Sequence, residues 1–378
     1  MKIESRFQPR SKNGPPGESS SSGPQPIMMH RRTLLTAPLV LAAASALSRV
    51  QAAEQYLVAA QGNTEEFLIP ADDPGVQLYL RNKRSVGAGA QSPARIVLFV
   101  HGLSYPASVV FDLALEGQSW MDFIAARGFD VWCVDIRGYG RSSRPPEFDQ
   151  PATDNPPILD AATATRDLAT ASAFIRQRRG LPRLTILAWS WGTVLAARHA
   201  SESPDLVDQL ILYAPVWTWQ GPDPSPSAPP VAYRSVTADA ALEAWRKAAP
   251  ANKRESLLPA DWSKQWVDAV WATDPKGARM KPPVLRVPNG PLAEVAESWK
   301  TGRAFFDPVH ITAPTQLIVA EWDRTTPPAQ ALALFPLLTN SPGKRLVVLP
   351  EGTHSIFLER NRKSLFNTVQ SFLEGGGA

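Results

Sequence analysis

The sequence predicts an α/β protein built on a mostly parallel sheet, and two observations lead to that prediction. Short, β-rich apolar runs alternate along the chain with segments of helix-forming residues, as in folds whose strands are connected by helices. Several of these runs, such as Ile96–Val100, are apolar without interruption, which is typical of strands buried on both faces. The 378 residues are 44% hydrophobic and 20% charged, so the chain can bury a substantial core.

Residues 1–52 have a different composition from the rest and are expected to be an extension followed by a secretory leader. Residues 1–27 are rich in Ser, Pro and Gly, and translation is expected to start at Met28 or Met29 instead of Met1.

The leader itself begins with Arg31-Arg32, which precede an apolar, alanine-rich run to Leu47. Val50-Gln51-Ala52 has the small-x-Ala form that signal peptidases accept, and the arginine pair resembles a twin-arginine export signal. The apolar run is too short for a comfortable membrane span. The mature protein is therefore expected to be exported to the periplasm without a stable span, with secretion or anchoring by an uncleaved leader as the alternatives.

The charge of the remaining chain is close to zero. Residues 1–52 hold seven of the 39 basic and two of the 35 acidic residues, which leaves 32 basic and 33 acidic residues beyond them. This balance indicates neither a nucleic-acid partner nor binding to anionic lipid. The single cysteine, Cys133, is expected in a buried strand, and no internal disulfide can form.

Eight strands are predicted, the first two joined by the strong turn sequence Asp72-Asp73-Pro74-Gly75. In chain order they are Glu66–Ile69, Val76–Arg81, Ile96–Val100, Phe129–Asp135, Leu184–Trp189, Asp208–Tyr213, Thr315–Ala320 and Arg345–Leu349. Apolar residues at helical spacing, such as Trp120, Phe123 and Ile124, mark the helices between them. The predicted helices are Ser119–Arg127, residues 160–179, Thr193–Ala200, Ala329–Phe335 and Asn361–Leu373.

The alternation stops between residues 216 and 309. This segment holds seven of the twelve tryptophans, many prolines and several short helical patterns. It is expected to be an insertion, called the cap below, over one end of a core formed by residues 53–215 and 310–378.

Ser190 lies where the apolar run Leu184–Trp189 meets the helix-forming run Thr193–Ala200. A strand that turns this sharply into a helix holds the side chain at the turn clear of the backbone, and small residues at Ala188 and Gly192 allow the close approach. Serine needs a base to act as a nucleophile. Ser190 is therefore a candidate nucleophile, with a buried serine at a strand end as the alternative.

His354 is the candidate base, because it lies in a loop just after the strand Arg345–Leu349, where catalytic groups collect in parallel sheets. The other histidines are His30 in the leader, His101 at a strand end, His199 on the helix after Ser190, and His310.

An imidazole base needs a carboxylate to fix its tautomer. Asp323 follows directly on the strand Thr315–Ala320 and is preferred over Glu321 and Asp307.

The negative charge that develops on a carbonyl oxygen needs fixed N–H donors. The backbone N–H groups of Trp191 and of Leu103, which follows His101-Gly102, are the candidates. Ser104 either adds a hydroxyl to the substrate site or caps the next helix.

Together these residues resemble the α/β-hydrolase fold family over nearly the whole chain after the leader. The resemblance rests on His101-Gly102, the loop Asp135–Ser142, Ala188–Gly192, Asp323 and His354, with Ser, Asp and His in the family's order. It implies an eight-stranded, mostly parallel sheet with helices on both faces and a helical cap inserted after the sixth strand. Ala188 in place of glycine and the tryptophans beside Ser190 depart from the family pattern.

The resemblance favours an esterase that acts on a small molecule, without metal or cofactor. Haloalkane dehalogenases and epoxide hydrolases resemble this fold but place Asp at the nucleophile position. Proline iminopeptidases share Ser-Trp-Gly, but their His-Gly-Gly-Pro-Gly is not matched by His101-Gly102-Leu103-Ser104-Tyr105. They and carbon–carbon bond hydrolases are the alternatives, with cofactor-free haloperoxidases and a non-catalytic binding relative behind them.

Trp189, Ser104 and the cap residue Trp217 are expected to contact the substrate. The cap tryptophans as a group are candidates for the wall of an aromatic or apolar acyl pocket, although any one of them can instead fill the core of the cap. For Trp191, substrate contact and packing beneath the site are both open. No cluster of metal-ligating residues at ligand spacing is present, and the oligomeric state is left open.

Overall fold

The computed structural model describes residues 56–61, 63–85, 95–219 and 228–375. The predicted leader and the two methionines at its start lie outside these residues. Within them, no helix combines the length and apolar character needed to cross a bilayer.

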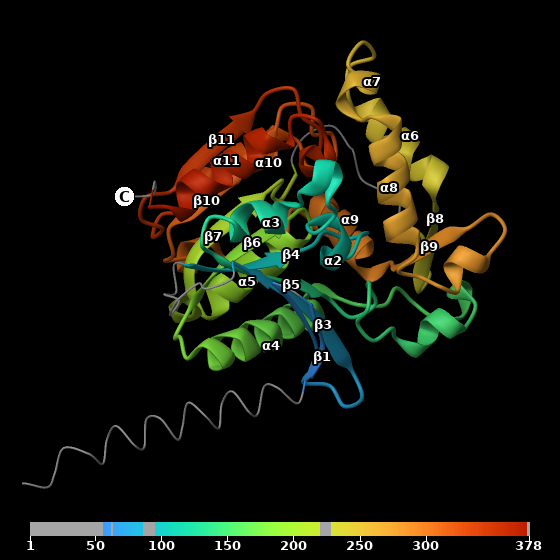
Figure 1. The fold of residues 1–378 in the computed structure, drawn as a ribbon, viewed down its shortest axis with the longest axis horizontal. Helices are drawn as coiled ribbons and strands as arrows, with labels where there is room; N and C mark the ends of the chain where they lie inside the picture. Colours follow the sequence, from blue (N-terminus) through green and yellow to red (C-terminus); the bar gives the residue numbers. More distant parts are fainter. Residues whose placement is uncertain (1–55, 62, 86–94, 220–227, 376–378) are drawn as a thin grey trace, which may run out of the picture. The chain divides into compact units, whose positions relative to one another are not determined.

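A sheet of nine strands organises the described chain, in the order β1-β2-β3-β5-β4-β6-β7-β10-β11 (Figure 1). From β5 to β11 all neighbours are parallel, and β1, β2 and β3 add antiparallel pairings at one edge. The strands are β1 (Leu57–Gln61), β2 (Thr64–Pro70), β3 (Gln77–Arg84), β4 (Ile96–Val100), β5 (Asp130–Asp135), β6 (Leu184–Trp189), β7 (Val207–Tyr213), β10 (Thr315–Ala320) and β11 (Arg345–Leu349).

The mostly parallel sheet is confirmed, but the predicted count of eight strands is wrong. The additional strand is β1, which pairs with β2 through registers such as Gln61↔Thr64. The run Leu57-Val58-Ala59-Ala60 has neither the alternation of apolar and polar residues nor the flanking turn residues that identify a strand in a sequence.

Helices cover both faces of the sheet. They are α2 (Ala107–Val110), α3 (Trp120–Ala125), α4 (Ala161–Arg179), α5 (Gly192–Glu202), α10 (Pro328–Leu334) and α11 (Arg362–Leu373). Figure 1 shows α4 and α5 together on one side and α3 and α11 on the other. The longest of them, α4, begins where the Asp160 side chain accepts a hydrogen bond from Thr163 N and ends at Gly180, whose φ of 66° suits a residue without Cβ.

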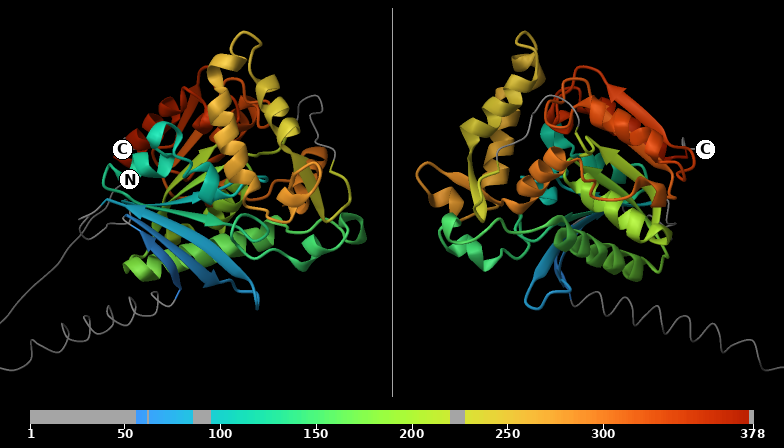
Figure 2. Two further views of the ribbon diagram at one scale, coloured as in Figure 1. Left: turned by 45° about the vertical axis from the view of Figure 1, so that its right-hand side comes forward. Right: turned by 180° about the vertical axis from the view of Figure 1, so that it is seen from behind.

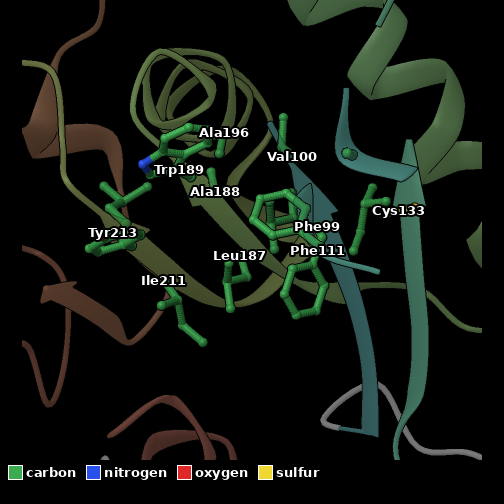
Figure 3. Packing of buried hydrophobic residues seen from close by; sticks show 14 of the residues in the cluster. Phe99, Val100, Phe111, Cys133, Leu187, Ala188, Trp189, Ala196, Ile211 and Tyr213 are labelled. Atoms are coloured by element: carbon green, nitrogen blue, oxygen red, sulfur yellow. The ribbon is translucent and has the colours of Figure 1, made fainter. Parts of the chain in front are cut away.

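The core forms where neighbouring strands present side chains in register. Phe99, Leu187 and Ile211 are aligned across β4, β6 and β7, so they share one face, and Phe111 packs beside them (Figure 3). All four are fully buried. Cys133 on β5 is buried and free, as expected for a strand residue.

The segment assigned to the cap contains a small sheet as well as helices (the yellow and orange ribbon of Figures 1 and 2). Its elements are β8 (Tyr233–Thr237), α6 (Ala238–Ala248), α7 (Arg254–Leu257), α8 (Ala260–Trp271), β9 (Val284–Pro288) and α9 (Gly290–Thr301). The antiparallel pair β8–β9 corrects the expectation of a helical cap. Each strand has only five residues, and a proline ends β9, so neither gives a clear strand pattern.

Candidate active site

Ser190 occupies the sharp turn between β6 and α5 in a conformation that few side chains adopt. Its φ is +56°, in the left-handed region, and the turn is held by hydrogen bonds from Ser190 N to Tyr213 O (3.0 Å) and from Thr193 N to Ser190 O (2.8 Å). A left-handed serine costs of order 1–3 kcal/mol, which the surrounding structure must offset. Strained backbone of this kind is typical of a nucleophile at a strand-to-helix turn.

Small residues beside the turn are required by the close approach of β4. A Cβ at Gly192 would lie 2.4 Å from His101 O and 2.7 Å from Val100 O, both rigid backbone atoms. A Cβ at Gly102 would lie 3.0 Å from Ser190 Cβ. Glycines at these positions therefore allow the loop after β4 to lie against the serine.

Three predicted side chains, from loops after three different strands, form one chain of hydrogen bonds. His354 Nε2 lies 2.9 Å from Ser190 Oγ, and His354 Nδ1 lies 2.7 Å from Asp323 Oδ2. Ser190 and Asp323 are each 3% exposed, so this chain is largely shielded from water. The imidazole can accept the serine proton at one nitrogen while the carboxylate holds the other, which is the arrangement needed to activate a hydroxyl group.

Asp323 is fixed by its own loop. Its Oδ1 accepts hydrogen bonds from Thr325 N (2.9 Å) and Thr326 N (2.8 Å), and its Oδ2 accepts one from Thr326 Oγ1 (3.0 Å). These donors leave Oδ2 directed at His354. Glu321, by contrast, accepts from Glu351 N, and Asp307 accepts from Val309 N, so neither of the two rival carboxylates is bonded to the histidine.

The loop of His354 is held from beneath. The carbonyl of His354 accepts hydrogen bonds from Tyr213 OH (2.8 Å) and Trp189 Nε1 (3.0 Å). The neighbouring Thr353 donates to the fully buried carboxylate of Glu359, whose pKa is raised by burial. The imidazole thus projects from a backbone fixed on both sides.

Two other histidines, His101 and His199, are buried and are not part of the Ser190–His354–Asp323 chain. His101 Nε2 accepts a hydrogen bond from Ile136 N (3.1 Å), so the ring proton is on Nδ1, which donates to Gly102 O (2.7 Å). Burial lowers the pKa of His101. His199, on α5, is buried, and desolvation lowers its pKa to about 4. Both are therefore neutral at pH 7.

The backbone N–H groups of Trp191 and Leu103 lie in segments that adjoin Ser190. Neither donates a hydrogen bond to another group of the described chain, so both are free to bind a ligand. The side chain of Trp191 is fully buried and does not line the cavity described next.

A cavity of about 350 Å³ opens beside Ser190 and His354. Its walls come from the segments after β4, β6, β7, β10 and β11 and from cap helices α6 and α9. The lining residues are Leu103, Ser104, Tyr105, Trp189, Ser190, Val216, Ala241, Ala244, Trp245, Ala248, Leu292, Val295, Trp299, Arg324, Thr325, Thr326, Thr353, His354 and Ser355. They are mainly apolar and aromatic, and none is acidic.

Of the three residues expected to contact substrate, Trp189 and Ser104 line the cavity, and Trp217 does not. Ser104 does not cap the following helix, whose N-cap is Pro106; its hydroxyl accepts a hydrogen bond from Arg234 (2.9 Å). Trp217 instead packs against Phe306, with ring centroids 5.1 Å apart. Its backbone N–H donates to Gln330 Oε1 on α10 (2.9 Å), and its carbonyl accepts from Trp299 Nε1 (2.8 Å).

Cap residues Trp245 and Trp299 line the cavity, together with Tyr105. The sequence offered the cap tryptophans only as a group and did not distinguish these two, and it gave no role to Tyr105. Tyr105 directly follows Ser104, a predicted substrate contact, and this position could have indicated that Tyr105 lies near the site. The two tryptophans lie on α6 and α9, and their sequence neighbourhoods resemble those of the other cap tryptophans. The described residues contain no group of three or more metal-ligating side chains placed to hold an ion.

Comparison with known proteins places these observations in a family. The model described as "Alpha/beta hydrolase family" matches residues 97–365. A search among curated proteins finds no significant match.

Solved structures with similar folds include three hydrolases of low sequence identity. Epoxide hydrolase I of potato is 16% identical, with 82% of this chain and 99% of that chain covered at a TM-score of 0.56. An enol-lactonase from Burkholderia xenovorans is 17% identical, with 81% and 99% covered at 0.52. A thermophilic esterase from Thermogutta terrifontis is 18% identical, with 84% and 100% covered at 0.50. At these identities the likeness concerns the fold.

Proposed function

The chain belongs to the alpha/beta hydrolase family, and from that premise we propose that it is a serine hydrolase that cleaves a carboxylic ester of a small or medium-sized apolar or aromatic substrate. The observation that carries the proposal is the hydrogen-bond chain from Asp323 through His354 to Ser190 at the wall of a mainly apolar cavity. Serine at this position, where a carboxylate would attack an epoxide or a haloalkane, favours acyl transfer.

In the first half of the reaction, Ser190 Oγ attacks the ester carbonyl while His354 Nε2 takes its proton. Asp323 keeps the proton of His354 on Nδ1 and stabilises the imidazolium that forms. The carbonyl oxygen becomes negatively charged and accepts hydrogen bonds from Trp191 N and Leu103 N. When the tetrahedral intermediate collapses, His354 returns the proton to the leaving alcohol, and the acyl group remains on Ser190.

In the second half, a water molecule takes the place of the alcohol. His354 removes its proton as it attacks the acyl carbonyl, and the same two N–H groups stabilise the second intermediate. Collapse releases the acid and returns the proton to Ser190. Because each half uses the same base and donors, no further catalytic group is needed.

The cavity supports the proposed substrate class. About 350 Å³ is at the lower end of small-molecule sites, so it suits a small or medium-sized group. Its apolar and aromatic walls favour a hydrocarbon or aromatic moiety. An aminopeptidase must bind the positively charged amino terminus of its substrate, and the absence of Asp and Glu from the lining favours the ester over that alternative.

A turnover assay tests the proposal. Residues 53–378 and the variant Ser190→Ala are given p-nitrophenyl esters of increasing acyl length and proline p-nitroanilide. We expect ester cleavage by the wild type, none by Ser190→Ala, and no anilide release. Anilide release would move the protein to the aminopeptidases. Absence of turnover together with absence of labelling by a fluorophosphonate would indicate a non-catalytic binding relative.

We also propose that the enzyme acts after export, on the strength of the arginine pair and cleavage-site pattern in the leader. Fractionation of a bacterial host tests this. The full chain should reach the periplasm in a shortened form, and replacing both arginines of the pair by lysine should retain it in the cytoplasm. Periplasmic protein from the double variant would contradict the twin-arginine route.

A further inference from the structure

Arg234 on β8 connects the cap to the loop that carries one of the two proposed oxyanion donors. Its Nη2 donates to Leu103 O (3.1 Å) and to Ser104 Oγ (2.9 Å), and its Nη1 donates to Pro288 O (2.9 Å) at the end of β9. One guanidinium thus binds both strands of the small cap sheet to the loop after β4.

This guanidinium has no carboxylate partner among the residues that the structure describes. The buried arginines Arg137 and Arg286 are paired with Asp167 and Asp274, whereas Arg144 shares with Arg234 a set of acceptors that contains no carboxylate. Burial lowers the pKa of Arg234, and the ionisable side chains that act on it are the phenols of Tyr105 and Tyr139, which burial keeps neutral by raising their pKa. A partly buried cation without a counter-ion is costly to keep, so stability alone gives a poor reason for an arginine here.

The hydrogen bonds of Arg234 act on the geometry of Leu103. The Leu103 carbonyl accepts both from Arg234 and from Tyr139 OH (2.9 Å), which fixes the peptide group directly after the Leu103 N–H. An oxyanion donor is effective only if it is held in place before the reaction begins. The positive charge beside the same peptide also favours negative charge on a nearby substrate oxygen.

We propose that Arg234 is a positioning residue through which the cap holds the oxyanion loop in its active geometry. Acyl transfer then requires the small cap sheet to be seated on the core, because without it the loop loses one of the two donors that fix its carbonyl. This proposal rests on the serine hydrolase function proposed above.

The chain offers a matched control in Arg144. Its guanidinium also joins core to cap through backbone carbonyls, donating to Gly138 O (3.3 Å), Arg286 O (3.3 Å) and Thr273 O (3.1 Å). It also has a pKa lowered mainly by burial. Within the described chain, none of these hydrogen bonds goes to the loop after β4. Arg144→Gln therefore weakens the attachment of the cap without acting on Leu103.

The experiment compares Arg234→Gln, Arg234→Lys and Arg144→Gln with the wild type. It measures kcat and KM for a p-nitrophenyl ester, the rate of fluorophosphonate labelling, and the thermal midpoint. In Arg234→Gln we expect kcat and the labelling rate to fall roughly 10- to 100-fold, somewhat less than removal of a donor itself, with KM changed less than about threefold. Arg234→Lys should recover part of the loss, and Arg144→Gln should keep kcat.

Two results would overturn the proposal: an equal loss of kcat in Arg234→Gln and Arg144→Gln, or a loss confined to KM. Arg234→Lys decides the matter if Arg234→Gln does not fold, since lysine keeps the charge and can reach one acceptor. Failure of the underlying function is distinguishable, because the wild type would then neither turn over nor be labelled, and the proposal would fall with it.

Discussion

Replacing Asp323 by asparagine tests how the carboxylate directs the imidazole. The carboxylate accepts four hydrogen bonds, from Thr325 N and Thr326 N on Oδ1 and from Thr326 Oγ1 and His354 Nδ1 on Oδ2. An amide has only one accepting oxygen. The two backbone N–H groups require it at the Oδ1 position, so the amide NH₂ faces His354.

The NH₂ group then donates to His354 Nδ1 and forces the ring proton onto Nε2. With that proton pointing at Ser190 Oγ, 2.9 Å away, the imidazole cannot accept the serine proton. Flipping the amide would restore the tautomer but would leave two buried N–H groups unsatisfied, at about 1–3 kcal/mol each. The active, flipped form is therefore disfavoured by about 2–6 kcal/mol, which at 1.36 kcal/mol per decade is roughly 30-fold to 10⁴-fold.

We accordingly expect kcat for a p-nitrophenyl ester to fall between about 30-fold and 10⁴-fold in Asp323→Asn, the upper figure matching the wrong-tautomer loss in serine protease triads. The thermal midpoint should change little. Glu321→Gln and Asp307→Asn are the matched controls and should keep kcat within about twofold, as expected of exposed carboxylates. A tenfold loss or less in Asp323→Asn would refute the reasoning, most clearly if a control lost more.

Three further outcomes are expected. Ser190→Gly should abolish turnover yet raise the free energy of unfolding by about 1 kcal/mol, since glycine accepts φ of +56° without strain; a lower value in urea unfolding would contradict this. The pKa of His199 is lowered from 6.5 to about 4, so as the pH falls the unfolded chain binds a proton at this residue before the folded chain does. The contribution of His199 to the free energy of unfolding is therefore complete above pH 6.5 and declines as the pH falls towards 4, by about 2 kcal/mol at pH 5. His199→Leu should reduce the dependence of the unfolding free energy on pH over this range, and an unchanged dependence would refute the assignment. Trp245→Ala should shift the preferred acyl group to a longer one, whereas Trp217→Ala should leave that preference unchanged and cost about 3–5 kcal/mol of stability; a changed preference in Trp217→Ala would contradict the assignment of the cavity wall.

The central strands were readable in the sequence because they are buried on both faces. Ile96–Val100 and Thr315–Ala320 occur with the predicted bounds, and every residue of both strands is buried. β1, at the edge of the sheet, and the five-residue strands β8 and β9 were missed. Their pairing depends on neighbours that come into contact only in the folded chain, which short segments do not reveal.

The positions of Ser190, Asp323 and His354 were also within reach of the sequence. Each follows a strand of one parallel sheet, and the carboxyl ends of such strands meet at one edge. The residues that line the cavity could not be predicted from the sequence, because they depend on how α6 and α9 lie over that edge of the sheet. Trp245 and Trp266 both lie in short helical patterns of the cap sequence, and only the fold shows that Trp245 lines the cavity and Trp266 does not. The contact of Arg234 with Leu103, 131 positions away, left no local pattern either.

Labelling with a fluorophosphonate tests the central claim, that Ser190 is the nucleophile, most directly. The wild type is titrated with the probe while residual esterase activity is followed, and the modified peptide is identified by mass spectrometry. The structure leads us to expect one adduct per chain, on Ser190, with activity lost in proportion to labelling and no adduct in Ser190→Ala. An adduct on another residue, or ester turnover that persists when Ser190 is fully modified, would contradict the account.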